Sequence, residues 1–307
     1  MNKIHDLIII GSGPAGLTAS IYASRAELDT IVIEKNMMSG GQIINTYEVD
    51  NYPGIPGISG FDLALKLREH SDKLGATFVE GDVIGFSVQD QIKKVVLDNG
   101  DEYLAKAVII ATGAVTRKLG VVGEEDFSGM GVSYCATCDG AFFKNRTTVV
   151  VGGGDVAVED AIYLSRLCKK VYIIHRRDEF RAAKTLVTQL MKLDNVEILW
   201  DSVVEEILGD EFVESVKVKN IKNEENRLLT VDGVFIAVGY NPASEVYREV
   251  VEVDRSGYIV AGETCETSVP GIYAAGDIRT KALKQIITAA SDGANAITSV
   301  EKYLTTL

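Results

Sequence analysis

The chain has 307 residues, 46% of them hydrophobic, and this combination excludes a disordered protein. A chain of this length usually divides into more than one domain, so we expect two. The formal net charge is −13, and acidic residues are spread along the whole chain. This balance argues against duplex nucleic acid or an anionic membrane as the main partner.

No segment of the sequence is typical of export or of a membrane span. The first apolar run, Leu7–Ile10, is too short for the hydrophobic core of a signal peptide. No apolar run approaches the roughly 18 residues that a membrane-spanning helix needs. We therefore expect a cytoplasmic protein.

The N-terminal region predicts a βαβ unit that binds a dinucleotide. The run Leu7–Ile10 is typical of a buried parallel strand, and it leads directly into a glycine-rich turn and an alanine-rich helix. A second strand, Thr30–Ile33, ends at Glu34. Glycines there tighten the turn, let a pyrophosphate approach backbone N–H groups and let helix and strand pack closely, while the acid accepts hydrogen bonds from a ribose. The residues expected to bind the cofactor in this unit are Gly11, Gly13, Pro14, Ala15, Gly16 and Glu34.

Two of the four cysteines, Cys135 and Cys138, form a C-x-x-C pair. A structural zinc site needs four ligands, and the sequence offers neither a second such pair nor a histidine cluster beside the first. The pair therefore favours a redox dithiol, which requires only two sulfurs close enough to bond and a lowered thiol pKa. Asp139 could exchange a proton with a thiolate, or it could cap a helix or turn. Cys168 and Cys265 are expected to be buried apolar residues.

The dinucleotide unit recurs after the cysteine pair. A strand at 147–151 precedes the turn 152–157, and a further strand at 171–174 follows. Glu34 lies 18 residues after Gly16, and His175 lies 18 residues after Ala157, so the two registers coincide. Each repeat is also followed by a later strand that ends in a glycine turn, at 108–113 and at 234–239. The duplication predicts an α/β fold with two Rossmann-like nucleotide-binding domains.

Where the first repeat carries a carboxylate, the second carries His175-Arg176-Arg177, with Arg181 one turn later. A carboxylate would repel a ribose 2′-phosphate, whereas guanidinium groups bind it bidentately, so the sequence predicts NADPH rather than NADH. A solvated charge run is the alternative, but these arginines directly follow a strand, where open α/β sheets bind ligands. The residues expected to bind NADPH are Gly152, Gly154, Asp155, Val156, His175, Arg176, Arg177 and Arg181.

In its motifs the chain resembles the low-molecular-weight, bacterial-type thioredoxin reductases, which are class II pyridine nucleotide-disulfide oxidoreductases. The resemblance covers essentially the whole chain in the family's order. One departure is Lys284, where the family often has arginine. The segments that carry the resemblance are Gly11–Gly16, Gly40–Gln42, Cys135–Gly140, His175–Arg177 with Arg181, and Ala275–Asp277.

The resemblance implies a discontinuous FAD-binding domain, at 1–117 and 245–307, with an NADPH-binding domain at 118–244 that is inserted into it and carries the dithiol. It also implies a homodimer, and chain crossings near Arg117 and Ser244 that act as a hinge. Further FAD contacts implied by the resemblance are Gly41, Gln42 and Asn51 near the flavin, Asp277 at the ribityl-phosphate arm, Gln285 and Ile286 at the pyrimidine end, and Val83 and Gly113.

The activity implied by the resemblance is an electron relay. Hydride passes from NADPH to FAD, the flavin reduces the Cys135–Cys138 disulfide, and the dithiol reduces thioredoxin or a thioredoxin-like protein. By position, Cys138 would face the flavin and Cys135 would attack the partner.

Three alternatives remain open. The same relay could reduce another acceptor, such as a peroxiredoxin system or a glutaredoxin-like protein. The chain could instead be a small-molecule dithiol oxidase. The chain could also be a non-catalytic redox sensor.

Phe142 and Phe143 follow the dithiol closely, and we expect them to pack in the core, with contact to a partner protein as the alternative.

Overall fold

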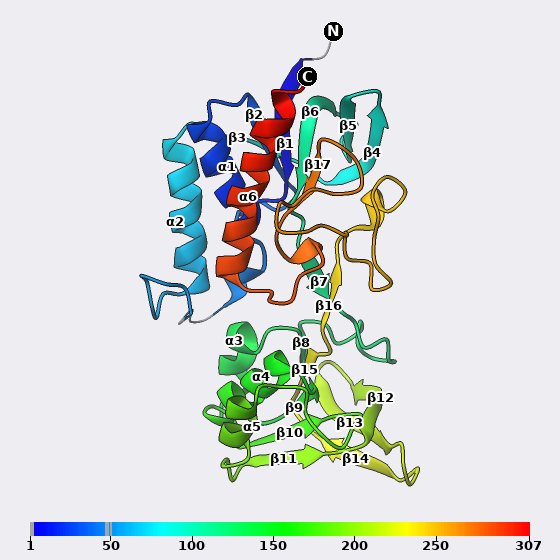
Figure 1. The fold of residues 1–307 in the computed structure, drawn as a ribbon. Coiled ribbons are helices and arrows are strands. Elements are labelled where there is room, and N and C mark those ends of the chain that lie inside the picture. Colours follow the sequence, from blue (N-terminus) through cyan, green and yellow to red (C-terminus); the bar gives the residue numbers. More distant parts are fainter. Residues whose placement is uncertain (1–2, 47–48, 50) are drawn as a thin grey trace. The chain divides into compact units, whose positions relative to one another are not determined.

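The computed structural model describes residues 3–46, 49 and 51–307, except for the side chains of Asn45 and Cys138. The chain divides into two compact units (Figure 1). The first unit comprises residues 1–115 and 241–307, and the second comprises residues 116–240. The second unit is thus inserted into the first, and the two connections pair as strands β7 (Ala114–Thr116) and β16 (Tyr240–Pro242).

Within the described residues the first unit contains a seven-stranded sheet in the order β3-β2-β1-β6-β5-β4, with β17 also paired to β6. The pairings of β1, β2, β3 and β17 are parallel, whereas β4, β5 and β6 form an antiparallel meander. The strands are β1 (Ile4–Ile10), β2 (Thr30–Glu34), β3 (Thr77–Glu80), β4 (Val83–Gln89), β5 (Ile92–Leu97), β6 (Glu102–Ile110) and β17 (Ile272–Ala274). The helices are α1 (Pro14–Arg25), α2 (Gly60–Lys73) and α6 (Ile286–Leu304), with the short 3-10 helices η1 (Gly41–Asn45), η3 (Glu245–Tyr247) and η4 (Gly276–Ile278).

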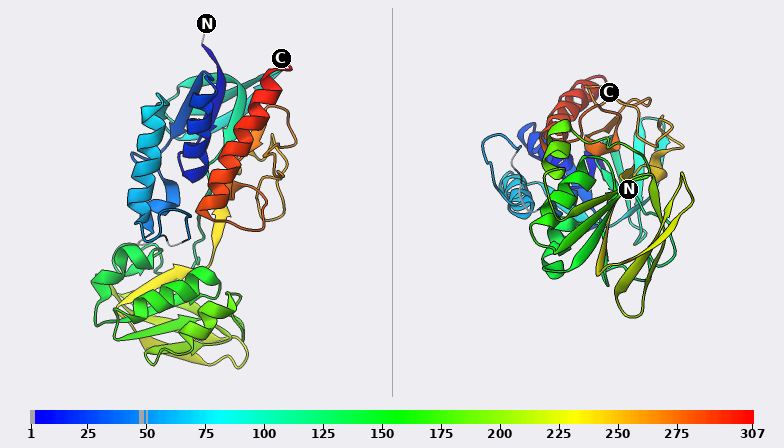
Figure 2. Two further views of the ribbon diagram at one scale, coloured as in Figure 1. Left: turned by 60° about the vertical axis from the view of Figure 1, so that its left-hand side comes forward. Right: turned by 90° about the horizontal axis from the view of Figure 1, so that it is seen from below.

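Strand β1 buries side chains on both faces of this sheet. Ile8 and Ile10 pack into a cluster that includes Leu97 of β5 and Tyr247 of η3. Leu7 and Ile9 point to the other face of the sheet, where they pack against the alanines of α1 and α6. Figures 1 and 2 show these helices, together with α2, along one side of the sheet. Each fully buried Leu or Ile contributes about 1.5–3 kcal/mol, so the apolar N-terminal run fixes the centre of this unit.

The second unit repeats this arrangement. Its parallel sheet has the order β11-β10-β9-β15-β8, and a separate antiparallel sheet has the order β12-β13-β14. The strands are β8 (Val132–Ser133), β9 (Thr147–Gly152), β10 (Lys170–Ile174), β11 (Val196–Leu199), β12 (Ser202–Gly209), β13 (Val213–Asn220), β14 (Asn226–Thr230) and β15 (Gly233–Ala237). The helices are α3 (Ala136–Asp139), α4 (Asp155–Ser165) and α5 (Lys184–Leu190), with the 3-10 helix η2 (Gly140–Phe143).

The strand order establishes the duplication. In the first unit β1 lies between β2 and β6, and in the second unit β9 lies between β10 and β15, with parallel pairing throughout. Val149 and Val151 of β9 face the antiparallel sheet, whereas Val150 faces α4, as the alternation in β1 requires. The predicted α/β fold with two Rossmann-like domains is confirmed.

The two phenylalanines after the cysteine pair have different environments. Phe143 is buried against Phe235, with ring centroids 5.3 Å apart. Phe142 is 76% exposed. The expectation of core packing is therefore right for Phe143 and wrong for Phe142, because consecutive residues of the short helix η2 point in different directions. Cys168 and Cys265 are buried, as predicted, and no helix in the described part of the chain is long and apolar enough to cross a membrane.

A buried ionic cluster joins α6 to the segment before it. Asp292 of α6 accepts two hydrogen bonds from Arg279, at 2.7 and 2.8 Å, and one from Lys281 at 2.8 Å. The backbone N–H of Gly276 donates to the same carboxylate at 2.8 Å. Burial alone would raise the pKa of Asp292, but these hydrogen bonds outweigh burial and the pKa is lowered.

We expect Asp292→Asn to lower the free energy of unfolding at neutral pH by ~3–5 kcal/mol, because it leaves two buried cations without their anion. Since the folded-state pKa is lowered, the ionised carboxylate stabilises the fold above its unfolded pKa near 3.8, and this stability is lost as pH falls below that value. The difference between wild type and variant in urea unfolding, followed by circular dichroism, should therefore shrink below about pH 4.

Asp72→Asn provides the matched control, because Asp72 pairs with Arg68 on the exposed surface of α2. That variant should cost less than ~1 kcal/mol. Equal losses in the two variants would show that the buried cluster contributes no more than a surface ion pair.

Candidate active site

The first glycine turn brings a helix N-terminus close to the end of β1. Gly11 has a φ of +99°, and a Cβ there would lie 2.5 Å from the carbonyl oxygen of Ala111. A Cβ at Gly16 would lie 1.8 Å from the carbonyl oxygen of Gly11. At Gly13, which precedes the first residue of α1, a Cβ would meet only the Gly40 carbonyl oxygen, at 4.0 Å. An anionic group can therefore approach the unpaired N–H groups of α1.

Glu34 ends β2 beside this turn. One carboxylate oxygen accepts hydrogen bonds from the backbone N–H and the hydroxyl of Ser12, both at 2.7 Å. The other oxygen accepts from the backbone and side chain of Asn36, both at 2.9 Å. These four bonds fix the carboxylate next to the glycine turn, where the sequence predicts the ribose.

The turn of η1 lies against the same loop. The N–H of Gly40 donates to the Ser12 carbonyl oxygen at 2.8 Å, and a Cβ at Gly41 would lie 3.3 Å from the Cα of Gly13. The side chain of Gln42 donates to the carbonyl oxygen of Ala114. The structure thus brings the second glycine segment next to the first, although about 30 residues separate them in the sequence.

Asn51 and Gln285 also meet in this unit. The amide of Asn51 donates to the Gln285 side-chain oxygen at 2.8 Å. Gln285 is the N-cap of α6, which begins at Ile286, and its N–H donates to the hydroxyl of Thr288 at 3.1 Å. Gln285 and Ile286 thus lie at a helix N-terminus.

Asp277 is a candidate ligand-binding carboxylate. Burial raises its pKa, and its Oδ1 atom is buried and has no hydrogen-bond partner among the described residues. Such an atom is costly unless it is paired, so a hydroxyl or N–H of a bound group would satisfy it. The adjacent N–H of Gly276 is held by Asp292, which fixes the position of this segment.

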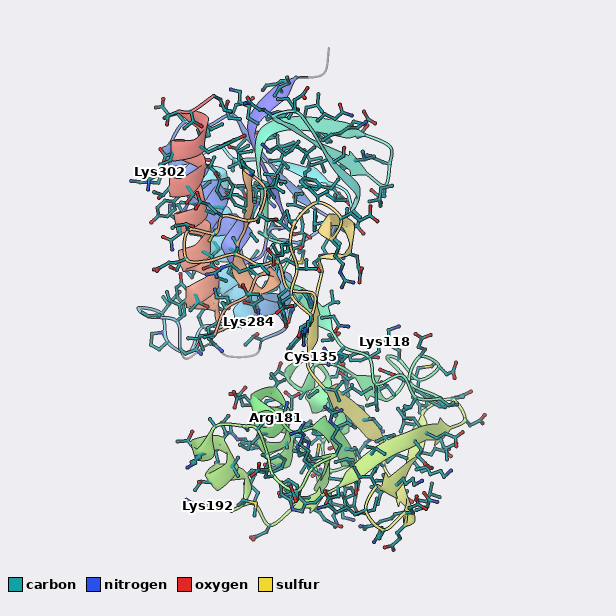
Figure 3. The ribbon with its side chains drawn as sticks, turned by 45° about the vertical axis from the view of Figure 1, so that its right-hand side comes forward. Lys118, Cys135, Arg181, Lys192, Lys284 and Lys302 are labelled. Carbon is teal, nitrogen blue, oxygen red and sulfur yellow. The ribbon has the colours of Figure 1, made fainter. Side chains whose placement is uncertain are left out.

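Lys284, labelled in Figure 3, directly precedes Gln285. Its ammonium donates to the carbonyl oxygens of Asp277 and Arg279, each at 3.0 Å, and lies 3.8 Å from the ring centroid of Tyr258. Burial lowers the pKa of Lys284. The lysine therefore supports the backbone of the Asp277 segment.

Val83 and Gly113 complete the predicted residues of the first unit. The side chain of Val83 is in the core, so only its backbone is available to a ligand. The N–H of Gly81 donates to the Glu34 carbonyl oxygen at 3.0 Å, which brings this turn to the end of β2. Gly113 follows β6 with a φ of +66°, and its carbonyl oxygen accepts the N–H of Ala243 at 3.1 Å.

The second unit contains an equivalent glycine turn. Gly152 has a φ of +153°, and a Cβ there would lie 2.2 Å from the carbonyl oxygen of Ala237. Gly154 is the N-cap of α4, as Gly13 is of α1, and a Cβ at Gly154 would meet nothing within 4 Å. Asp155 and Val156 begin the helix, and the Asp155 carboxylate accepts the N–H of Ala183 at 2.7 Å. Backbone N–H groups of this turn are thus available to an anion.

The predicted arginines gather beside this turn. Arg176, Arg177 and Arg181 are exposed on the segment after β10, and the N–H of Arg181 donates to the Gly153 carbonyl oxygen at 2.8 Å. The imidazole of His175 is buried beneath Gly153 and stacks on Phe180. Burial lowers the pKa of His175, and the three nearby guanidinium groups lower it further, against a hydrogen bond to the Glu179 carbonyl oxygen. The exposed positive charge of the site therefore belongs to the arginines.

Cys135 forms a disulfide bond in this structure, whereas Cys168 and Cys265 are free. The side chain of Cys138 lies outside the described part of the structure. The Cys135 sulfur is 3.4 Å from the hydroxyl of Thr137. Figure 3 labels Cys135 and Arg181, which both belong to the second unit.

Asp139 accepts a hydrogen bond from the hydroxyl of Ser133, with 2.6 Å between the oxygens. Although Asp139 is the N-cap residue of η2, its side chain makes no capping hydrogen bond, so the alternative role as a cap is not realised. Sequence reasoning missed Ser133 and Thr137. A hydroxyl residue on each side of Cys135 was the available signal. No group of three or more metal-binding side chains exists among the residues that the structure describes.

Comparisons with known proteins agree with this geometry. Residues 5–293 match the family model described as pyridine nucleotide-disulphide oxidoreductase. The thioredoxin reductase of Listeria innocua is 49% identical over 98% of this chain and 94% of its own length. That of Bacillus subtilis is 47% identical over 98% and 95%. The crystal structure of Lactococcus lactis thioredoxin reductase is 43% identical, covers 99% of this chain and 100% of that one, and superposes with a TM-score of 0.93.

Two dinucleotide-binding units and a C-x-x-C pair define a nucleotide-dependent disulfide oxidoreductase. The chain belongs to the pyridine nucleotide-disulphide oxidoreductase family, and within it to the thioredoxin reductases. It is therefore a flavoprotein oxidoreductase, and its family implies the use of FAD and of a nicotinamide nucleotide. The residues described above fit such groups, since both helix N-termini have room for an anion and Asp277 has a buried oxygen without a hydrogen-bond partner among the described residues.

Gly154→Ala should separate binding from folding. Because a Cβ at Gly154 has open space and the φ of −93° is ordinary, the free energy of unfolding should change by less than about 0.5 kcal/mol. Nicotinamide-nucleotide affinity, measured by calorimetry, should fall, because the Cβ occupies the approach to the helix N-terminus. Gly16→Ala is the contrasting variant, since its Cβ meets a carbonyl oxygen and should destabilise the fold. Unchanged nucleotide affinity in Gly154→Ala would exclude this turn as the binding site.

Proposed function

We propose that the chain transfers electrons from NADPH through FAD to a Cys135–Cys138 disulfide, and from the resulting dithiol to thioredoxin or a thioredoxin-like protein. The observation that carries this proposal is a disulfide-bonded Cys135 in a C-x-x-C segment, within a chain that also has two dinucleotide turns with opposite charges at the ribose position. The names of the related proteins support the choice of acceptor.

The two units divide the cofactors. FAD would bind to the first unit, with its pyrophosphate at the N-terminus of α1, its ribose at Glu34 and its ribityl-phosphate arm at Asp277. NADPH would bind to the second unit, with its 2′-phosphate held by Arg176 and Arg177. The flavin supplies the means of passing an electron pair from a nicotinamide to a disulfide. The two connections of the chain would act as a hinge between these tasks.

The residues around the dithiol support proton and thiolate chemistry. The hydroxyl of Thr137 lies next to the Cys135 sulfur and can stabilise it as a thiolate. Asp139 is held one helical turn from Cys135 and would exchange a proton with the pair. By the family pattern, Cys138 faces the flavin and Cys135 attacks the partner.

Phe142 would contact the partner protein. Its ring is 76% exposed and follows Cys138 by four residues, so it offers exposed apolar surface close in sequence to the dithiol. A thioredoxin-like partner needs such a surface, whereas a small-molecule dithiol oxidase does not.

A homodimer and a cytoplasmic location remain predictions, and so does the choice of thioredoxin over a glutaredoxin-like or peroxiredoxin acceptor. An assay of these acceptors with NADPH separates the choices. In a non-catalytic sensor the flavin would bleach with NADPH, but none of the acceptors would be reduced.

Replacement of Arg176 and Arg177 by alanine should raise the Michaelis constant for NADPH at least tens-fold, because the variant loses charge-assisted hydrogen bonds worth ~1.5–3 kcal/mol each. Use of NADH should barely change, since NADH has no 2′-phosphate. Arg166→Ala is the control, because Arg166 is exposed at the opposite end of α4 from the glycine turn. Equal losses with both coenzymes would show that the two arginines support the fold.

Serine variants of the two cysteines should separate their roles. Cys135→Ser leaves a single thiolate at Cys138, which beside the flavin should produce a long-wavelength charge-transfer band. Cys138→Ser should lack this band and instead trap a thioredoxin variant that has no resolving cysteine, as a stable mixed disulfide.

Both serine variants should still bleach when NADPH is added, and both should fail to turn over thioredoxin. Exchange of the band and the trapping between the variants would reverse the assignment of the two sulfurs. Loss of bleaching in both variants, with FAD still bound, would contradict the relay itself.

A further inference from the structure

Ser133 occupies a position between Cys135 and Asp139. It ends β8 and is 6% exposed. Its hydroxyl oxygen is 2.6 Å from Oδ2 of Asp139, 3.0 Å from the backbone nitrogen of Cys135 and 3.2 Å from the Cys135 carbonyl oxygen. One buried hydroxyl therefore contacts both a redox cysteine and the predicted proton-exchanging carboxylate.

The direction of these hydrogen bonds follows from the distances and the charge. The hydroxyl has a single proton, and a bond to a carboxylate is both shorter here and stronger than one to a neutral carbonyl oxygen. Ser133 therefore donates to Asp139 and accepts the N–H of Cys135. The result is one continuous chain of hydrogen bonds, from the Cys135 backbone through the hydroxyl to the carboxylate.

The strand gives this hydroxyl a fixed position. Val132 and Ser133 pair with Val234 and Phe235 of β15, at the edge of the parallel sheet of the second unit. Asp139 instead lies on α3, a helix of only four residues, and it is followed by a 3-10 turn. Since so short a helix constrains its side chains weakly, the sheet sets the position of the carboxylate through Ser133.

We propose that Ser133 is a positioning residue that holds the Asp139 carboxylate for proton exchange with the Cys135–Cys138 dithiol during reduction of a protein disulfide. The proposal rests on the proposed function and adds a residue to it. The attacking enzyme thiolate forms a mixed disulfide as one partner sulfur leaves. The second enzyme thiol then loses its proton, attacks the enzyme sulfur of the mixed disulfide, and the other partner sulfur leaves with a proton. Asp139 accepts the proton from that thiol and returns it to the leaving sulfur.

A purely local role for Ser133 is the competing explanation. Serine hydroxyls often accept a backbone N–H two residues later and thereby stabilise a turn. In that case the carboxylate contact would be incidental, and loss of the hydroxyl would disturb the Cys135 backbone whether or not Asp139 could ionise.

A double-mutant cycle distinguishes the two explanations. The variants are Ser133→Ala, Asp139→Asn and their combination, each isolated as the FAD-containing enzyme, reduced in advance, and mixed with oxidised thioredoxin in a single turnover. Ser133→Ala should slow thioredoxin reduction about tenfold, a part of the effect expected for general acid–base catalysis. Asp139→Asn should slow it at least as much, and the double variant should be no slower than Asp139→Asn alone.

Three further measurements complete the test. Flavin bleaching by NADPH should be unchanged in every variant, because that step precedes the dithiol. Ser133→Thr should restore most of the rate, since it restores the hydroxyl. Ser202→Ala is the matched control: Ser202 is also 6% exposed, lies in the second unit, and donates its hydroxyl to the Trp200 carbonyl oxygen, so its loss should leave the rate unchanged.

Additive effects of Ser133→Ala and Asp139→Asn, or a wild-type rate in Ser133→Ala, would overturn the positioning role. Either result leaves the proposed function standing as long as the wild-type enzyme reduces thioredoxin. If the wild-type enzyme bleached with NADPH but did not reduce thioredoxin, the proposed function itself would fail.

Discussion

Both units depend on the close approach of a helix N-terminus to the end of a parallel strand. In the first unit a Cβ at Gly16 of α1 would lie 1.8 Å from the Gly11 carbonyl oxygen, and in the second a Cβ at Gly152, which ends β9, would lie 2.8 Å from the Cβ of Ala157 on α4. No side chain fits at these points, so the turns require glycine. The benefit is that N–H groups of α1 and α4 remain available to an anion, since the N-cap positions Gly13 and Gly154 have no close neighbour for a side chain.

The repeated scaffold carries opposite charge beside its two glycine turns. The Glu34 carboxylate is held by four hydrogen bonds from Ser12 and Asn36, so it forms a fixed, negatively charged edge. In the second unit the corresponding residue, His175, is buried, and the guanidinium groups of Arg176 and Arg177 are exposed on the segment that follows. A duplicated fold can in this way distinguish two nucleotides that share a pyrophosphate, because discrimination depends on the residues after the second strand and the glycine turn is common to both.

Sequence reasoning identified whatever is encoded locally. Apolar runs, glycine turns and matched spacing predict strands, helix N-termini and the arginine cluster, because each depends on residues adjacent in the chain or on one βαβ unit. It could not identify the Asp292 cluster, which joins a helix to a loop through burial that no periodicity reveals. It also predicted one environment for Phe142 and Phe143, although a single 3-10 turn buries one ring and exposes the other. The contact between Ser133 and Asp139 escaped for a related reason, since it forms only when a sheet edge meets a one-turn helix.

The thiols of this chain show how its fold restricts redox chemistry to one segment. Burial raises the pKa of Cys168, and burial together with the charge of Asp292 raises the pKa of Cys265 to about 12. A thiol must ionise to attack a disulfide, so a raised pKa keeps these two cysteines from attacking one near neutral pH. Cys135 is in a different environment, with the hydroxyl of Thr137 at its sulfur and Ser133 at its backbone. Because the other two thiols are kept protonated in the core, neither supplies the thiolate that exchange with a disulfide requires, and thiol–disulfide exchange is confined to the C-x-x-C segment.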